Sequence, residues 1–519
     1  MGALSSPQPE KLSLSNADLA RWQQAQQLIA SGRAPQALPA YLSLVKSAPA
    51  VASLWFECGV AAIAAVEFDT ARRAFAQARQ LAPGNAQLLN ALAQQYHRLR
   101  QPADARACFQ QAAAADPHSV HAALSLAAWL EREHDLDGAW QCCEEVLARH
   151  PGDPNALYYR AFLLHRKGQG AEAESLLRAI GKMDFTDPNL RISCRHLLGV
   201  VLDELGRYDE ALACLAESKN AIRASANVAA FEQAYEKAER ARRQLLADLT
   251  PQMISRWRQD TPAPPQTLAL LGGHPRSGTT LLEQILGAHP DVAAFDESEA
   301  FATQIWDQLA PASAPTCSAQ SLHSLSPSRC SSMRAGYFRS LFRELEAAPA
   351  GKVLIDKNPG PTAALPFWLR LFPASKIIIA LRDPRDVVIS CYFQQLTLTP
   401  TNVNFLSLER AAKHFGDLMD VWLRMRELGG FDWIETRYED FVANLEAEGR
   451  RVTEFLGLAW HPGQARCHEA ASRKLVFSPT YNDVTKPAHN RAIGRWRHYQ
   501  SALEPALSRL APYFDKRTT

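Results

Sequence analysis

The sequence predicts an all-α solenoid of helical repeats followed by a three-layer α/β domain with a mostly parallel sheet. Two observations lead to this fold class. The first half of the chain repeats with a period of 34 residues, which is typical of stacked helical pairs. The second half contains two strand–turn–helix segments whose turns carry glycine or arginine. That pattern is typical of anion sites at the carboxyl edge of a parallel sheet.

The composition is that of an ordinary globular protein. The chain has 519 residues, of which 47% are hydrophobic and 21% charged, and its formal net charge is +2. At about 100–200 residues per domain, this length predicts two to four domains. A net charge so close to zero does not indicate a nucleic-acid partner. No stretch reaches the roughly 18 apolar residues that a membrane-spanning helix needs, so no transmembrane segment is expected.

The N-terminus and the cysteines bear on location. The first residues contain no apolar core of a secretory signal. The 10 cysteines are scattered without zinc-ligand spacing. In a chain without a secretory signal, such cysteines are typical of free thiols in a reducing compartment. The sequence therefore predicts a cytoplasmic protein without a metal site.

The repeat is defined by four positional features. An alanine recurs every 34 residues, with a small residue twelve positions before it and in most copies a larger one four positions after it, at Ala37, Ala71, Ala105, Ala139 and Ala173. Proline lies twelve positions after the first four of these alanines. A sixth copy follows after a slip of 38 residues, with Gly199, Ala211 and Leu215. The small residues predict close helix crossings, and the prolines predict where each second helix ends.

The period and these positions together resemble the tetratricopeptide repeat (TPR) family over residues 17–222. The resemblance implies about six repeats and a concave groove that binds a peptide or another protein. A dimer interface or a scaffold for the second half of the chain are the alternatives, since a fold alone does not settle its use.

One segment is expected before this array and two after it. Residues 1–16 form an N-terminal tail, and residues 223–266 connect the array to a second domain at 267–519. The connection is expected to be a charged helix over 223–260 that ends in the stiff proline-rich stretch TPAPPQ.

The second domain opens on a predicted phosphate loop. Strand, turn and helix are expected at 267–271, 272–278 and 279–288. Backbone N–H groups and the helix dipole at such a helix start favour an anion. The spacing Gly273–x4–Gly278 is P-loop-like, but Thr279 stands where nucleotide hydrolases have lysine. A nucleotide phosphotransferase is therefore disfavoured. Arg276 supplies a cation that is able to bind two oxygens of a phosphate or sulfate at once; a tight turn with a surface arginine is the alternative.

A second strand–turn–helix segment follows at 376–393. Its turn, RDPRD, begins at Arg382, directly after a buried strand. Ser390 lies eight residues later, two helical turns on, where it is able to share a phosphate with Arg382. An ordinary turn with a solvated run of charges is the alternative.

Together these segments resemble the sulfotransferase superfamily, over about residues 267–500. Within it, PRSGTTLLEQILGAHPDV at 275–292 is close to the pattern of the tyrosylprotein sulfotransferases. The resemblance implies transfer of a sulfuryl group from 3′-phosphoadenosine 5′-phosphosulfate (PAPS) to an acceptor hydroxyl by in-line displacement. The product of the donor would be adenosine 3′,5′-bisphosphate, and no metal would be needed.

The resemblance also implies a role for each matching residue. The donor is expected to contact Arg276, Ser277, Gly278, Thr279, Thr280, Arg382, Ser390, Tyr438, Lys486 and Arg495. Glu297 is expected to act as the base, with the reacting sulfuryl group stabilised by Arg276, Lys357 and Thr480. Thr480 stands where the family has serine and keeps the hydroxyl. Arg495 stands where the family has lysine and keeps the positive charge.

The sequence differs from the family pattern at two positions, one near the nucleotide and one near the acceptor. Gln394 and Glu299 stand where the family has arginine. A carboxylate at Glu299 repels an acidic tyrosine peptide, so the acceptor is left as a protein, a peptide or a small hydroxyl compound. Asp296, Glu299 and His274 are the alternative bases. A catalytically inactive TPR scaffold is the alternative function. The serine- and proline-rich residues 310–332 are expected to be a surface insertion or a lid.

Overall fold

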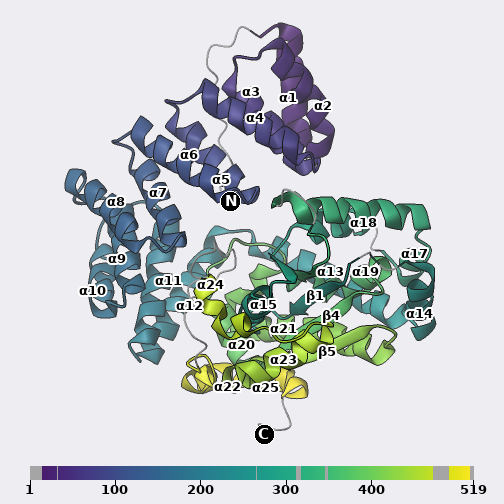
Figure 1. Cartoon of the computed structure of the whole chain (residues 1–519). Coiled ribbons are helices and arrows are strands. Elements are labelled where there is room, and N and C mark those ends of the chain that lie inside the picture. The colour runs from purple at the N-terminus through teal and green to yellow at the C-terminus, as the bar shows by residue number, and fades with distance from the viewer. Residues whose placement is uncertain are drawn as a thin grey trace. The chain divides into compact units, whose positions relative to one another are not determined.

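The computed structural model describes residues 14–31, 33–262, 264, 266–310, 317–344, 349–471 and 490–514. It divides into two compact units, and Figure 1 traces the chain through them. One unit runs to Gln169 and also takes in Phe342–Glu346, and the other begins at Gly170 and holds the rest of the chain. The division falls within the fifth repeat, and the boundaries expected at 222 and 266 stay predictions.

The first unit consists of the antiparallel helices that the repeat predicts. Its helices are α1 Asn16–Ala30, α2 Ala34–Ser47, α3 Ala52–Ala64, α4 Phe68–Leu81, α5 Ala86–Arg98, α6 Pro102–Ala115, α7 Val120–Arg132, α8 Leu136–Arg149 and α9 Pro154–Arg166. The small residues lie where the helices cross: a Cβ added to Gly59 would come within 2.3 Å of the Phe75 ring. The predicted helical repeat is confirmed.

Five of the described turns between paired helices share one backbone conformation. Val66, Arg100 and His134 have φ of 62°, 59° and 65°, and Gly168 and Gly206 occupy the same place with φ of 78° and 77°. Side chains with a Cβ are crowded in this left-handed region, which glycine enters freely. The first three turns are therefore strained where the last two are not.

The second unit begins with the end of the array. Its first helices are α10 Gly170–Ile180, α11 Pro188–Glu204, α12 Tyr208–Ser225, α13 Val228–Asp248 and α14 Pro251–Asp260. The single helix expected over 223–260 is thus the end of α12 followed by two helices. The breaks arise because Asn227 caps α13, and Thr250 caps α14 with Pro251 in its first turn.

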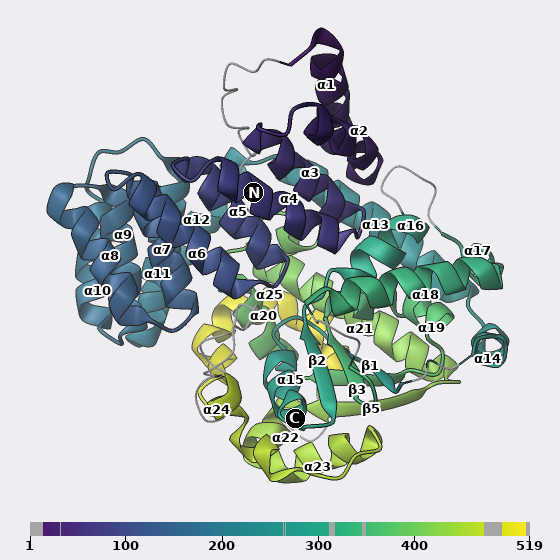
Figure 2. The ribbon, with the colours of Figure 1, turned by 45° about the horizontal axis from the view of Figure 1, so that its top comes forward.

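A five-stranded sheet forms the centre of the second unit (Figure 2). Its strands are β1 Leu268–Gly273, β2 Val292–Asp296, β3 Val353–Lys357, β4 Lys376–Leu381 and β5 Asp432–Arg437. They lie in the order β2-β3-β1-β4-β5, and each neighbouring pair is parallel. The predicted parallel sheet is confirmed, and the carboxyl ends of all five strands meet at one edge.

Helices cover both faces of this sheet. The helices after β1 are α15 Thr279–Gly287, α16 Asp307–Leu309, α17 Ala319–His323, α18 Pro327–Leu341, α19 Leu365–Leu371, α20 Pro384–Tyr392, α21 Leu408–Leu428, α22 Tyr438–Ala443, α23 Leu445–Phe455, α24 Cys467–Ala471 and α25 Gln500–Leu510. Leu282 and Ile285 of α15 pack with α23 against one face, around Ile355. On the other face, Tyr337 of α18 donates to Asp356 (2.8 Å), and Trp422 of α21 donates to Glu435 (2.7 Å).

The described part of the serine-rich stretch 310–332 is largely helical. Arg370 of α19 donates to the carbonyl oxygens of Leu322 (3.0 Å) and Leu325 (2.6 Å). These bonds hold α17 against the domain. Across the described residues, no helix is long and apolar enough to cross a membrane.

Candidate functional site: an anion-binding loop at the carboxyl edge of the sheet

The predicted phosphate loop joins β1 to α15, and two glycines shape it. Gly273 has φ of 128°, and a Cβ there would lie 2.3 Å from the carbonyl oxygen of Ala380 on β4. Gly278, with φ of 89°, caps α15 in the left-handed conformation. Glycine is required at both places because a side chain would collide or be strained. The loop therefore passes directly over the carboxyl ends of β1 and β4.

Arg276 has an unusual backbone within this loop. Its φ is 73°, in the region that side chains with a Cβ rarely adopt. Its carbonyl oxygen accepts from Arg382 (3.1 Å), and its Nε donates to the hydroxyl of Ser390 (3.0 Å). Strained residues held by their surroundings cluster at functional sites. The three residues that the two motifs predicted independently are thus brought together.

Arg382 reaches the loop because it directly follows β4, and Asp383 caps the helix α20 that carries Ser390. The guanidinium of Arg382 lies 4.9 Å from the ring centre of Tyr438, at the start of α22, and also donates to the carbonyl oxygen of Ala492. Its side chain is buried, and its Nε has no partner among the described residues. A buried guanidinium with an unused donor suits an anion.

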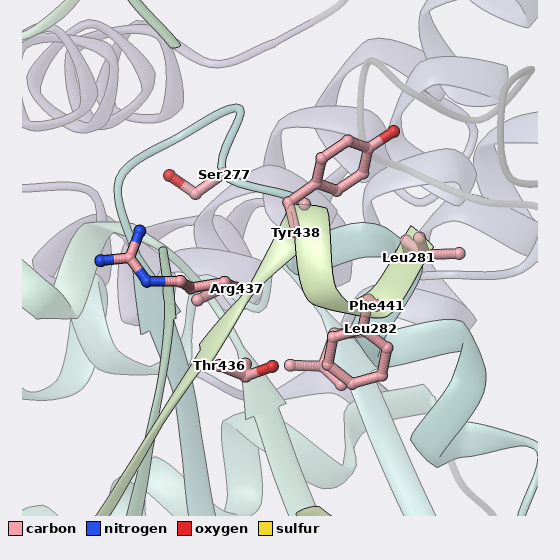
Figure 3. Close-up of a pocket in the computed structure, with 9 residues that line it drawn as sticks. Ser277, Leu281, Leu282, Thr436, Arg437, Tyr438 and Phe441 are labelled. Atoms are coloured by element: carbon pink, nitrogen blue, oxygen red, sulfur yellow. The ribbon is translucent and has the colours of Figure 1, made fainter. Parts of the chain in front are cut away.

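Tyr438 packs on the loop itself. A Cβ at Gly278 would come within 2.7 Å of the tyrosine ring. Figure 3 shows a small cavity beneath, with Leu282 and Phe441 at its apolar base and Ser277 and Tyr438 above. Ser277 and the first helical residues Thr279 and Thr280 are buried, so their positions are set by the surrounding protein.

Glu297 and Lys357 meet beside the loop because β2 and β3 are neighbours. Asp296 pairs in register with Lys357, and the backbone N–H of Glu297 donates to the Lys357 carbonyl (2.8 Å). The fully buried Nζ of Lys357 contacts Glu297 Oε1 (3.0 Å) and the Asp296 carboxylate. Burial opposes its charge, but Asp296 and Glu297 outweigh that effect and raise the pKa of Lys357. The lysine therefore stays an ammonium.

Glu297 is the exposed member of this cluster. Its side chain is 40% exposed, whereas that of Asp296 is 5% exposed. Its φ of 49° is in the left-handed region, like that of Arg276. The carboxylate is thus held by Lys357 on one side and open to solvent on the other.

His274 does not share this arrangement. It is buried, its Nε2 lies 2.8 Å from Nδ1 of His414 on α21, and its Nδ1 lies 2.7 Å from the Pro275 carbonyl oxygen. Burial lowers its pKa to about 4, so the ring is neutral near pH 7. The carbonyl fixes the proton on Nδ1, and Nε2 accepts from His414. The histidine thus supports the loop from beneath.

The remaining predicted residues either contact parts of the protein other than the loop or lie outside the described chain. Thr480 and Lys486 lie outside the described residues. Arg495 donates to Asp203 of α11 (2.7 Å), with its guanidinium 4.0 Å from the ring centre of Phe393. Gln394 donates to the Ser390 carbonyl (3.2 Å). Glu299 is an exposed residue two positions after Glu297.

Sequence reasoning missed Asp386. This buried carboxylate of α20 accepts from the backbone N–H groups of Gly494 (2.7 Å) and Trp496 (2.9 Å). It fastens the segment that follows residues 472–489 to the helix of Ser390. The available signal was its place in the RDPRD turn. That signal is not specific, because an acidic residue in the first turn of a helix also interacts favourably with the helix dipole.

Three protein families match segments of this chain. Residues 269–462 match the sulfotransferase family, residues 23–86 match the tetratricopeptide repeat, and residues 132–218 match anaphase-promoting complex, cyclosome, subunit 3. The C-terminal half carries a sulfotransferase domain. The sulfotransferase match begins within β1 and ends beyond α23, so it contains the loop, Glu297, Lys357 and Arg382.

Curated relatives are similar over the sulfotransferase domain. Protein-tyrosine sulfotransferase A of Caenorhabditis elegans is 24% identical over 242 residues, which cover 44% of this chain and 60% of that protein. Protein-tyrosine sulfotransferase 1 of Danio rerio is 24% identical over 268 residues, covering 47% of this chain and 71% of that protein. The chain thus spans about three fifths to seven tenths of the length of these relatives.

Solved structures are similar to each half. The sulfotransferase domain of the Synechococcus PCC 7002 olefin synthase is 18% identical with a TM-score of 0.35, covering 49% of this chain and 97% of that one. A tetratricopeptide repeat protein from Parabacteroides merdae is 15% identical with a TM-score of 0.32, covering 41% of this chain and 81% of that one.

Proposed function

We propose that the protein transfers a sulfuryl group from PAPS to an acceptor hydroxyl. The observation that carries this proposal is the convergence of Arg276, Arg382 and Ser390 at a helix-capping loop of a sulfotransferase domain. The buried, unpartnered Nε of Arg382 supports an anionic ligand there. Arg382 and Ser390 would hold the 3′-phosphate, and Tyr438 would lie beside them. The α15 start, from Ser277 to Thr280, would hold the 5′-phosphosulfate.

In this proposal PAPS supplies the sulfuryl group. The acceptor oxygen forms the new S–O bond as the bond to the phosphate oxygen breaks, and Glu297 takes the hydroxyl proton. A base is needed because a phenol has a pKa of about 10 and an alcohol a higher one. Lys357 and Arg276 stabilise the charge on the sulfuryl oxygens and leaving phosphate, together with Thr480. The other product is adenosine 3′,5′-bisphosphate, which Lys486 and Arg495 would help to hold.

The acceptor is proposed as a hydroxyl of a protein, peptide or small compound, a peptide tyrosine included. The curated relatives are protein-tyrosine sulfotransferases, which favours a protein or peptide. Glu299 weighs against an acidic peptide, because an exposed carboxylate next to the proposed base repels one. The TPR array is proposed to bind a protein partner in its groove. A cytoplasmic location is also part of the proposal.

Calorimetry with three nucleotides tests the donor assignment. Adenosine 3′,5′-bisphosphate should bind at least about tenfold more tightly than AMP, since a charged hydrogen bond contributes roughly 1.5–3 kcal/mol. Arg382→Gln should abolish this preference, whereas Arg450→Gln, at an exposed arginine of α23 paired with Glu446, should keep it. Equal affinities would refute the 3′-phosphate site, and Mg²⁺-dependent ATP binding would favour a phosphotransferase. A screen of cell extract with labelled PAPS then identifies the acceptor.

A further inference from the structure

The segment 492–499 lies against the proposed nucleotide site. Its Ala492 carbonyl oxygen accepts from Arg382, and its backbone at Gly494 and Trp496 donates to the buried Asp386. The guanidinium of Arg385 lies 3.9 Å from the centre of the Trp496 ring. These contacts join the segment to the turn and helix that present Arg382 and Ser390. Its backbone position is therefore coupled to that of the proposed 3′-phosphate site.

The same segment is held from the other side by the sixth helical pair. Asp203, near the end of α11, accepts from the Arg495 guanidinium (2.7 Å) and from the Tyr499 hydroxyl. On the following helix α12, Tyr208 stacks on His498 with ring centres 3.9 Å apart and planes inclined by 16°. All these residues belong to the second compact unit. The last repeat thus contacts three side chains of the segment, all between residues 495 and 499.

Asp203 is placed to orient Arg495. The Asp203 side chain is 12% exposed and that of Arg495 is 26% exposed, so the ion pair is largely shielded from water. The Phe393 ring lies against the guanidinium, with its centre 4.0 Å away. A guanidinium has five N–H donors, and the carboxylate uses one terminal nitrogen. Charge-assisted bonds of this kind fix geometry as well as adding affinity.

We infer that Asp203 of the sixth helical pair is a positioning residue for the sulfuryl donor, which acts by holding Arg495 and the segment 492–499 against Arg382 and Asp386. The inference rests on the proposed function, because it concerns the same nucleotide site.

Calorimetry with adenosine 3′,5′-bisphosphate on the full chain tests this inference. Asp203→Asn keeps the size of the side chain and removes the charge that orients Arg495. We expect its dissociation constant to rise about tenfold, the usual effect of losing a charged hydrogen bond. The matched control is Asp209→Asn, an exposed aspartate in the first turn of α12, which should bind as wild type does.

Kinetics separate positioning from a merely structural role. With labelled PAPS, Asp203→Asn should raise KM for the donor while kcat and KM for the acceptor stay within about twofold. Because Asp203 acts through Arg495 and, to a smaller extent, through Tyr499, the double variant Asp203→Asn/Arg495→Gln should bind no more than about threefold more weakly than Arg495→Gln alone. Additive losses in the double variant would overturn the inference, and so would unchanged binding by Asp203→Asn.

A second variant covers the case in which Asp203→Asn does not fold. Tyr499→Phe removes only the hydroxyl that donates to Asp203, and it should raise the same dissociation constant about threefold. Unchanged binding would again overturn the inference. Failure of the proposed function has a different result, since the wild-type protein itself would then not bind adenosine 3′,5′-bisphosphate in preference to AMP.

Discussion

Glu297→Gln separates chemistry from binding and from folding. The amide keeps the shape of the side chain and can still accept from Lys357 Nζ, now 3.0 Å from Glu297 Oε1. It cannot take a proton from the acceptor. Loss of a general base lowers kcat by roughly 10²–10⁴, which corresponds to about 3–5 kcal/mol in the activation barrier.

The expected cost in stability is much smaller. The Glu297 side chain is 40% exposed, and solvent screening limits such an ion pair to about 1 kcal/mol or less. Lys357 is fully buried and keeps the carboxylate of Asp296 as its counter-ion. The free energy of unfolding should therefore change by no more than about 1 kcal/mol, well below the change in the barrier.

The assay is turnover of labelled PAPS with a confirmed acceptor, together with calorimetry of adenosine 3′,5′-bisphosphate. The nucleotide affinity of Glu297→Gln should stay within about twofold of wild type. The matched control is Glu299→Gln, which neutralises an exposed carboxylate two residues away and should keep kcat within a few-fold. Turnover of Glu297→Gln close to wild type would refute the assignment, as would a loss of nucleotide affinity as large as the loss of kcat.

Two further predictions concern stability and are checked by denaturant unfolding. Val66→Gly should raise the free energy of unfolding by about 0.5–1 kcal/mol, because removing the backbone strain at φ of 62° gains more than the added entropy cost of glycine. Arg100→Gly should gain less, because arginine is not branched at Cβ and is less strained there. Burial raises the pKa of Asp356 to about 7, so between about pH 4 and 7 the folded protein keeps a proton that the unfolded chain releases. Stability should therefore fall as the pH rises from about 4 to 7 and level off above that, and Asp356→Asn should gain at least about 1 kcal/mol over wild type between pH 5 and 8. An equal response of both proteins to pH would contradict this.

Local patterns in the chain predict the helices and strands and the residue types of the site. The 34-residue period predicts α1 to α9, and the crossing of Gly59 with Phe75 confirms why the small residue recurs. The strand at 376–381 coincides with β4, because β-branched runs and a following charged turn are local signals. Arg276, Arg382 and Ser390 were also predicted by their motifs, since anion binding needs these residue types at a helix start.

Which distant residues contact one another follows from the packing of the elements and is not predicted by local patterns. Asp386 in α20 holds Gly494, and Asp203 in α11 holds Arg495, yet nothing in the local sequence marks either aspartate as a partner. The positive φ of Arg276 and Glu297 is likewise set by the surrounding fold. Periodicity and turn chemistry act over a few residues, whereas these contacts join positions about one hundred to three hundred residues apart. They depend on how the sheet and the last helical pair pack together.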